Sequence, residues 1–91
     1  MQNAKVENMT SSRGNNVANQ FILTTDKGRF FQSYQSIIAF KSWDGTTKLD
    51  PHYWDYSVTT GKYRNQFLGE DKKETQAKID SGTYKLVDLN K

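Results

Sequence analysis

The sequence predicts an α+β domain: a small, mostly antiparallel sheet of about four or five strands, with two short helices packed on one face. The prediction rests on three observations. Two hairpin-like pairs of alternating apolar segments come first, two segments with helix start and stop signals follow, and another alternating segment comes last. Strands grouped ahead of helices are typical of antiparallel α+β architecture. We therefore expect both helices to be inserted before the last strand.

Length and composition limit the kind of protein. The 91 residues suit one small domain, and 34% apolar residues with 13% aromatic residues predict a core built on large rings. The chain has no cysteine, which excludes disulfides and thiolate metal sites. It has no apolar run long enough for a membrane span and no signal-peptide pattern. We therefore expect a soluble cytoplasmic protein that does not associate with membranes.

The first part of the chain is polar. Residues 1–16 contain a cluster of turn-forming residues, so we predict a poorly ordered N-terminal arm ahead of a single domain over residues 17–91. Within the arm, residues 5–9 are compatible with an edge strand. Arg13 could contact a phosphate, but we favour an ordinary polar terminus without a function.

Four segments predict two hairpins. Residues 17–25 and 29–34 are separated by Asp-Lys-Gly, and residues 36–43 and 46–49 are separated by Asp-Gly. Pro51 then ends the second hairpin, because proline cannot donate a ladder hydrogen bond. Aromatic residues alternate onto both faces of the second strand, so we expect the helices to cover one of these faces.

The clearest helix signals lie in the stretch WDYSVTTGKYRNQFLG. Thr59 is placed as the N-cap, with Val58 and Tyr63 as the two residues of a hydrophobic staple. Gly69 is placed as the left-handed C-cap. Tyr63 and Phe67 are four residues apart and therefore share one face. We expect a short helix that is anchored by these two rings.

A second helix is predicted to start at Asp71, which forms a capping box with Glu74, and to stop at Gly82. Glu74 and Lys78 are expected to form an i, i+4 ion pair. The helix has few apolar residues, so we expect it to lie on the surface and to be stabilised by docking. Residues 84–89 alternate in polarity and predict a final strand.

The sequence offers no defensible catalytic or metal site. His52 is the single histidine, and no carboxylate spacing around it fits a metal ion. Lys62 lies near the hydroxyls of Ser57 and Thr60, but the spacing matches no nucleophile and base motif. Gly61 with Lys62 lacks the upstream glycine of a phosphate loop. We therefore predict a protein that is not an enzyme and that needs no metal or cofactor.

The same stretch does have the composition of a binding surface. It interleaves aromatic rings with hydroxyls and cations, as protein hot spots and base-stacking surfaces both do. Some of its rings also suit the core, which we favour for Trp54 and Phe67. The candidate binding residues are Tyr53, Trp54, Tyr56, Ser57, Thr60, Lys62, Arg64 and Asn65.

Arg64 has two interpretations. Its guanidinium can form a planar bidentate pair with Asp55 and so lock the connection to the helix. Alternatively, it can stay free and bind an anionic ligand. We favour the ion pair.

The motifs FQSY, IA and LD and the core WDYS-x-TT-x-x-YRN-x-FL resemble a family of small uncharacterised proteins of bacteriophages and bacterial mobile elements. The resemblance runs from about residue 17 to residue 89 and implies no known activity. It implies a phage-encoded accessory protein in the host bacterial cytoplasm, which binds and modulates a host protein such as a defence-system component. The alternative is a module for single-stranded nucleic acid or RNA, with tyrosine and tryptophan stacking on bases and lysine and arginine contacting phosphates. The oligomeric state stays open.

Overall fold

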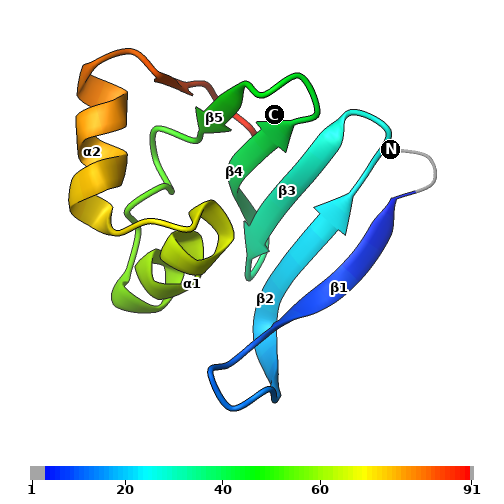
Figure 1. Cartoon of the computed structure of the whole chain (residues 1–91). Coiled ribbons are helices and arrows are strands. Elements are labelled where there is room, and N and C mark those ends of the chain that lie inside the picture. Colours follow the sequence, from blue (N-terminus) through cyan, green and yellow to red (C-terminus); the bar gives the residue numbers. More distant parts are fainter. Residues whose placement is uncertain (1–3, 91) are drawn as a thin grey trace.

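The computed structural model describes residues 4–90, which form a six-stranded sheet and two helices (Figure 1). The strands are β1 (Lys5–Thr10), β2 (Asn16–Thr24), β3 (Gly28–Ser33), β4 (Ser36–Ser42), β5 (Thr47–Leu49) and β6 (Tyr84–Leu86). The helices α1 (Val58–Leu68) and α2 (Lys72–Asp80) lie between β5 and β6. The predicted α+β class is confirmed, with both helices before the last strand.

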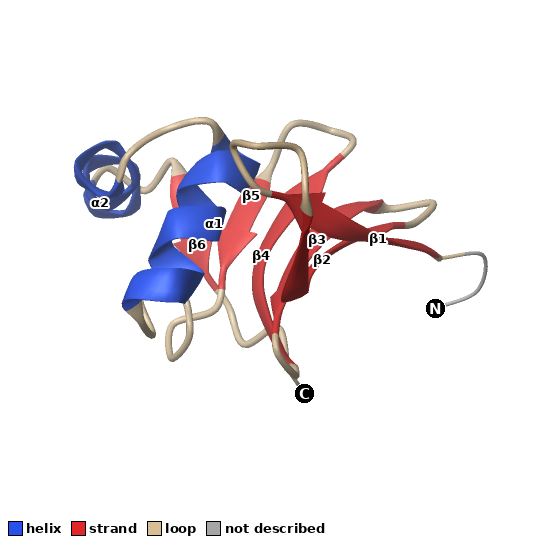
Figure 2. Cartoon of the chain, turned by 90° about the horizontal axis from the view of Figure 1, so that it is seen from below, coloured by secondary structure: helices blue, strands red, loops and turns tan. Residues whose placement is uncertain are grey.

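The strands lie side by side in the order in which they occur along the chain. The strands β1 to β5 pair with one another in antiparallel fashion. The last pair, β5 with β6, is the one parallel pair in the described sheet. A parallel pair needs a crossover connection, and the segment with α1 and α2 supplies it. Figure 2 shows both helices on the same side of the sheet.

Both predicted hairpins are present, since β2 pairs with β3 and β4 pairs with β5. The turn before β3 needs its glycine because two strands approach closely there. A Cβ atom on Gly28 would lie 2.3 Å from the carbonyl oxygen of Lys41. The turn is closed by Thr25, whose backbone N–H donates to the Gly28 carbonyl at 2.8 Å.

Part of the predicted N-terminal arm belongs to the sheet. The edge strand considered for residues 5–9 is present as β1, which pairs with β2. Met9 is 3% exposed and joins the core, so one apolar side chain anchors an otherwise exposed strand to the rest of the fold. Gln66 of α1 also donates to the Thr10 carbonyl at 3.0 Å. Residues 1–3 of the arm lie outside the described residues.

The core lies between the sheet and α1. Phe31 of β3 stacks on Phe67 of α1 with ring centroids 5.8 Å apart. Tyr63 and Leu68 of the helix are also buried in this cluster. The prediction that Tyr63 and Phe67 anchor the helix is confirmed.

The other face of the sheet carries rings without a covering helix. Leu23, Phe30 and Phe40 stand opposite one another on neighbouring strands, and each is half-buried. The Phe30 and Phe40 rings stack with centroids 4.3 Å apart. Aromatic residues therefore project on both faces of the sheet as predicted, and α1 covers one of these faces.

Helix α1 begins earlier than predicted. Its N-cap is Ser57 rather than Thr59, and the Ser57 hydroxyl accepts the backbone N–H of Thr60 at 3.1 Å. Ser57 has the extended backbone that a cap requires, whereas Thr59 lies inside the first turn. Gly69 is the left-handed C-cap, with a φ of 72°, as predicted.

Helix α2 has the predicted capping box between Asp71 and Glu74. The predicted ion pair between Glu74 and Lys78 is wrong, because the Lys78 Nζ atom lies 2.6 Å from Glu70 Oε1. The Glu70 side chain is only 4% exposed, so it gains more from a cationic partner than solvated Glu74 does.

Glu70 also links α2 to the last strand. Its carboxylate accepts hydrogen bonds from the hydroxyls of Thr75 and Tyr84, at 2.6 and 2.7 Å. Tyr84 begins β6, which ends at Leu86 and is thus shorter than the predicted strand over residues 84–89. Helix α2 therefore docks on the sheet as expected, through a polar cluster that joins it to β6.

Candidate binding pocket

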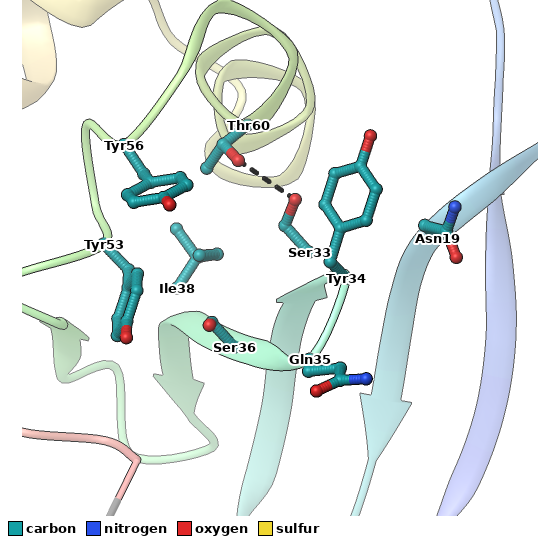
Figure 3. Close-up of a pocket in the computed structure, with 9 residues that line it drawn as sticks. All are labelled: Asn19, Ser33, Tyr34, Gln35, Ser36, Ile38, Tyr53, Tyr56 and Thr60. Atoms are coloured by element: carbon teal, nitrogen blue, oxygen red, sulfur yellow. Dashed lines mark hydrogen bonds between the residues drawn. The ribbon is translucent and has the colours of Figure 1, made fainter.

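A pocket of about 440 Å³ opens beside the N-terminal end of α1 (Figure 3). Its size falls within the range of roughly 300–1,000 Å³ that is usual for ligand sites. None of its lining residues carries a formal charge. We call it the tyrosine pocket, and it is lined by Asn19, Ser33, Tyr34, Gln35, Ser36, Ile38, Tyr53, Tyr56 and Thr60.

Tyr34 forms one side of the pocket from the turn between β3 and β4 (Figure 3). Its backbone is left-handed, with a φ of 56°, and its N–H donates to the carbonyl of Asn19 at 2.7 Å. Asn19 is left-handed too, with a φ of 65°. Such backbone conformations are uncommon outside glycine and concentrate at functional sites. The predicted strand over residues 29–34 therefore ends one residue early, and Tyr34 is 55% exposed.

Tyr53 and Tyr56 form the other side of the pocket (Figure 3). Their ring centroids lie 5.5 Å apart, with the ring planes inclined by 55°. Tyr56 is 68% exposed. Ile38, which is 1% exposed, lies between the two sides and forms an apolar floor.

Asp50 fixes the chain that carries Tyr53. Its carboxylate is fully buried, and Oδ1 accepts the backbone N–H groups of His52 and Tyr53 at 2.9 and 3.1 Å. Oδ2 accepts the backbone N–H of Leu89 and the amide of Asn90, both at 2.9 Å. Burial by itself would raise the pKa of Asp50, but these hydrogen bonds outweigh it and hold the pKa below its ordinary value. The tyrosine side is therefore tied to the core.

The back of the pocket joins the sheet to the helix. The hydroxyls of Ser33 and Thr60 are hydrogen-bonded at 3.0 Å (Figure 3). Thr60 also accepts a hydrogen bond from the Ser57 hydroxyl at 3.2 Å. Gln20 stands opposite Ser33 in the register and is fully buried, and its side-chain amide has no partner within residues 4–90.

Arg64 lies inside the structure and does not reach the pocket. Its side chain is 1% exposed, and Nη1 donates to the Trp54 carbonyl at 2.6 Å. Nη1 also lies 3.5 Å from Asp55 Oδ1, so the expected ion pair is present. The pair is not the planar fork that we predicted, because Nη2 donates instead to Asn65 Oδ1 at 2.9 Å. This correction removes Arg64 from the cations that a ligand could reach.

Burial also sets the protonation behaviour and the packing of Arg64. Burial lowers the pKa of its guanidinium, and the carboxylate of Asp55 opposes that shift. The guanidinium carbon lies 5.2 Å from the ring centroid of Trp54. Trp54 itself is half-buried against the core, as the core interpretation favoured.

The other predicted polar residues lie around a separate, more open depression. Asp55 and Lys72 share it, and their Oδ2 and Nζ atoms form an ion pair at 2.7 Å. The predicted residues in this depression are Ser57, Lys62, Arg64 and Asn65. The structure therefore brings Tyr53, Tyr56 and Thr60 together and separates them from the cations that were expected beside them.

Sequence reasoning missed the residues that the sheet contributes to the pocket. They are Asn19, Ser33, Tyr34, Gln35, Ser36 and Ile38. The usable signal was the short stretch Ser-Tyr-Gln-Ser between two apolar strands, which is a polar turn with an aromatic residue in it.

Two further findings concern residues 4–90 as a whole. No three histidine, aspartate or glutamate side chains in this range are grouped so that they could hold a metal ion. Neither α1 nor α2 has the length and apolar character needed to cross a membrane.

The model of a family of unknown function, DUF8033, matches residues 4–82. The matched range begins just before β1, includes both helices and contains every residue that lines the tyrosine pocket. Neither a curated protein nor a solved structure matches the chain.

Proposed function

Since the chain belongs to DUF8033, a family of unknown function, we propose from its geometry that it is a non-enzymatic protein that binds another protein through the tyrosine pocket. One observation carries this proposal: the lining is built from tyrosines and uncharged polar residues, while the cations lie elsewhere. The proposal concerns binding and involves no chemical step.

The composition of the pocket is that of a protein-binding surface. Tyrosine provides a large, rigid contact area at low entropic cost, and serine, asparagine and glutamine provide adaptable hydrogen bonds. Tyr34 and Tyr56 are exposed to solvent, at 55% and 68%, and are therefore accessible to a partner. Tyrosine is also enriched among the residues that dominate binding energy at interfaces.

The nucleic-acid alternative has less support. Its rings could stack on bases, but affinity for single strands also depends on cations that neutralise phosphates. The lining of the pocket contains no lysine or arginine. Arg64 is buried, and Lys72 is paired with Asp55 at 2.7 Å. Lys62 is exposed, but it lies around the other depression.

The motif resemblance supports a biological setting for this binding. We infer a phage-encoded accessory protein that binds and modulates a host protein in the bacterial cytoplasm. Defence-system proteins are the class of partner to examine first. The same resemblance implies no known activity.

The test is capture of a partner from host bacterial cells by tagged protein. We expect the wild type and Lys62→Ala to retain the same partner and Tyr56→Ala to lose it. Both substituted side chains are exposed, so a difference between them reports the pocket rather than the fold. Capture should survive nuclease treatment and moderate salt.

A different set of results would favour the nucleic-acid alternative over protein binding. Labelled single-stranded DNA or RNA would bind tightly, affinity would fall steeply with salt, and Lys62→Ala would abolish it. Fluorescence anisotropy at low and near-physiological salt distinguishes the two functions.

A further inference from the structure

We propose that the ligand of the tyrosine pocket is an extended, proline-rich peptide segment of the partner. This inference rests on the proposed function and adds the chemistry of what is recognised. Its support comes from the hydrogen-bonding groups, the shape and the strand pairing around the pocket.

The pocket presents aromatic rings whose hydroxyl groups are available to bond to a ligand. Within residues 4–90 the hydroxyls of Tyr34, Tyr53 and Tyr56 make no hydrogen bond to another residue. The Ser33–Thr60 bond is the one drawn between lining side chains (Figure 3). A pocket with free hydroxyls and no charge suits an uncharged polar ligand, and each hydroxyl can donate to an acceptor such as a carbonyl oxygen.

The backbone at two of the three tyrosines is held in place by hydrogen bonds. The N–H of Tyr34 donates to Asn19, and the N–H of Tyr53 donates to buried Asp50. The Tyr34 ring stands on one side and the Tyr53 and Tyr56 rings on the other, with Ile38 between them (Figure 3). A site ordered in advance loses less entropy on binding. Its geometry suits a flat or compact apolar group placed between rings.

The pocket does not suit a peptide that binds by adding a strand to the sheet. That mode requires an unpaired strand edge. The strands that border the pocket, β2, β3 and β4, are interior strands with a neighbour on each side, and Asn90 bonds to the backbone of Ile37 where β4 extends beyond β5. A peptide bound here must be recognised through its side chains and its carbonyl groups.

Proline-rich segments meet these conditions. They adopt the extended polyproline II helix, whose carbonyls point outward without internal hydrogen bonds. Proline has no backbone N–H, so such a ligand needs donors from the protein more than acceptors. Aromatic-lined grooves recognise these segments because the helix is already ordered before binding. The hydroxyls of the pocket would donate to the carbonyls while the rings pack on the proline side chains.

The test is an NMR titration of the full chain with synthetic peptides. The probes are polyproline and a panel of short peptides with two prolines three positions apart, each matched with a peptide carrying alanine in place of proline. We expect the ring signals of Tyr34, Tyr53 and Tyr56 to shift. Alanine in the peptide, or Tyr56→Ala in the protein, should weaken binding about tenfold or more, and Lys62→Ala should change it less than about twofold.

Tyr56→Phe refines the result, because it keeps the ring and removes the hydroxyl. We expect binding intermediate between the wild type and Tyr56→Ala if the hydroxyl donates to the peptide. Equal binding by the alanine-matched peptides would overturn the inference. So would failure of polyproline and the whole panel to shift the tyrosine signals, or binding of single-stranded RNA at those tyrosines.

The outcomes also separate this inference from the proposed function. If a host partner is captured through Tyr56 but no proline-rich peptide binds, the inference fails and the proposed function stands. If capture does not depend on Tyr56, the proposed function is wrong, and the inference that rests on it is wrong as well.

Discussion

The two sides of the segment that precedes α1 contain similar residues in opposite environments. On the inner side, Trp54 is half-buried and its carbonyl accepts from Arg64, which is 1% exposed. On the outer side, Tyr56 is 68% exposed and lies against Tyr53. Ring-rich, polar sequence therefore produces both a buried structural cluster and a more exposed pair of rings, the one for which we propose binding. Burial and completed hydrogen bonds distinguish the two, and residue type does not.

The largest expected effect is on the inner side. Arg64→Ala should lower the free energy of unfolding by about 2–4 kcal/mol, since it leaves a cavity and an unpaired Trp54 carbonyl. The ion pair itself contributes little, because Asp55 is 39% exposed. Urea unfolding of the wild type and the variant measures the difference.

Arg64→Lys is the matched variant for this prediction. Lysine keeps the charge but cannot reach Trp54 and Asn65 with two planar nitrogens, so it should also destabilise the protein. A loss below about 0.5 kcal/mol in both variants would contradict the structural assignment of Arg64.

The next largest effect is expected from acid, which should weaken the two buried carboxylates that brace both sides. The pKa values of Asp50 and Glu70 are held below their ordinary values, because hydrogen bonds from their partners outweigh the effect of burial. Both carboxylates therefore stabilise the fold at neutral pH, and this stabilisation is lost as the pH falls below about 5 and through their lowered pKa values. The free energy of unfolding, measured across that range, should decrease.

Asp50→Asn tests the origin of this acid dependence. The variant should be less stable at neutral pH and should lose less stability on acidification than the wild type. Tyr56→Ala, on the outer side, should leave the shape of the pH profile unchanged. If the free energy of unfolding of the wild type stayed constant down to pH 3, Asp50 and Glu70 would not be the stabilising carboxylates that we assign.

On the outer side, Tyr34→Gly should separate binding from stability. Glycine accepts the left-handed backbone without the cost that other residues bear, so stability should stay level or rise by up to about 1 kcal/mol. Capture of the partner should be lost with the ring. Thermal unfolding and the capture assay measure the two effects, and Tyr34→Ala shows the loss of the ring alone. A clearly destabilised Tyr34→Gly would show that the ring supports the fold.

The smallest effect is expected for Lys62→Ala. Lys62 is exposed and lines the depression away from the tyrosines, so stability should stay within about 0.5 kcal/mol. Affinity for the partner, measured by calorimetry, should stay within about twofold. A larger loss of affinity would extend the binding surface to that depression.

Local rules predicted much of the fold. The two hairpins, the left-handed Gly69 and the capping box of Asp71 all depend on neighbouring residues, and all are present. The parallel pairing of β5 with β6 joins two strands of three residues each, far apart in the chain, and no local pattern specifies it. The strand β1 was obscured because Met9 is its one buried side chain.

The candidate site was predictable only where it is local. Tyr53, Tyr56 and Thr60 come from one short stretch and line the pocket together. Strand alternation gave no sign that Tyr34 leaves the ladder in a left-handed turn. The path of the chain before α1 also depends on Asp50 and its bonds to residues 89 and 90, which sequence spacing does not reveal.

The order of the strands has a consequence for how the protein is made. Each of the strands β2 to β5 pairs with the strand synthesised just before it, so the sheet can grow as the chain leaves the ribosome. Every residue that lines the tyrosine pocket lies between positions 19 and 60. We expect the sheet side of the pocket to assemble before α2 and β6 have emerged. The bonds of Leu89 and Asn90 to Asp50 then form last and fix the segment that carries Tyr53.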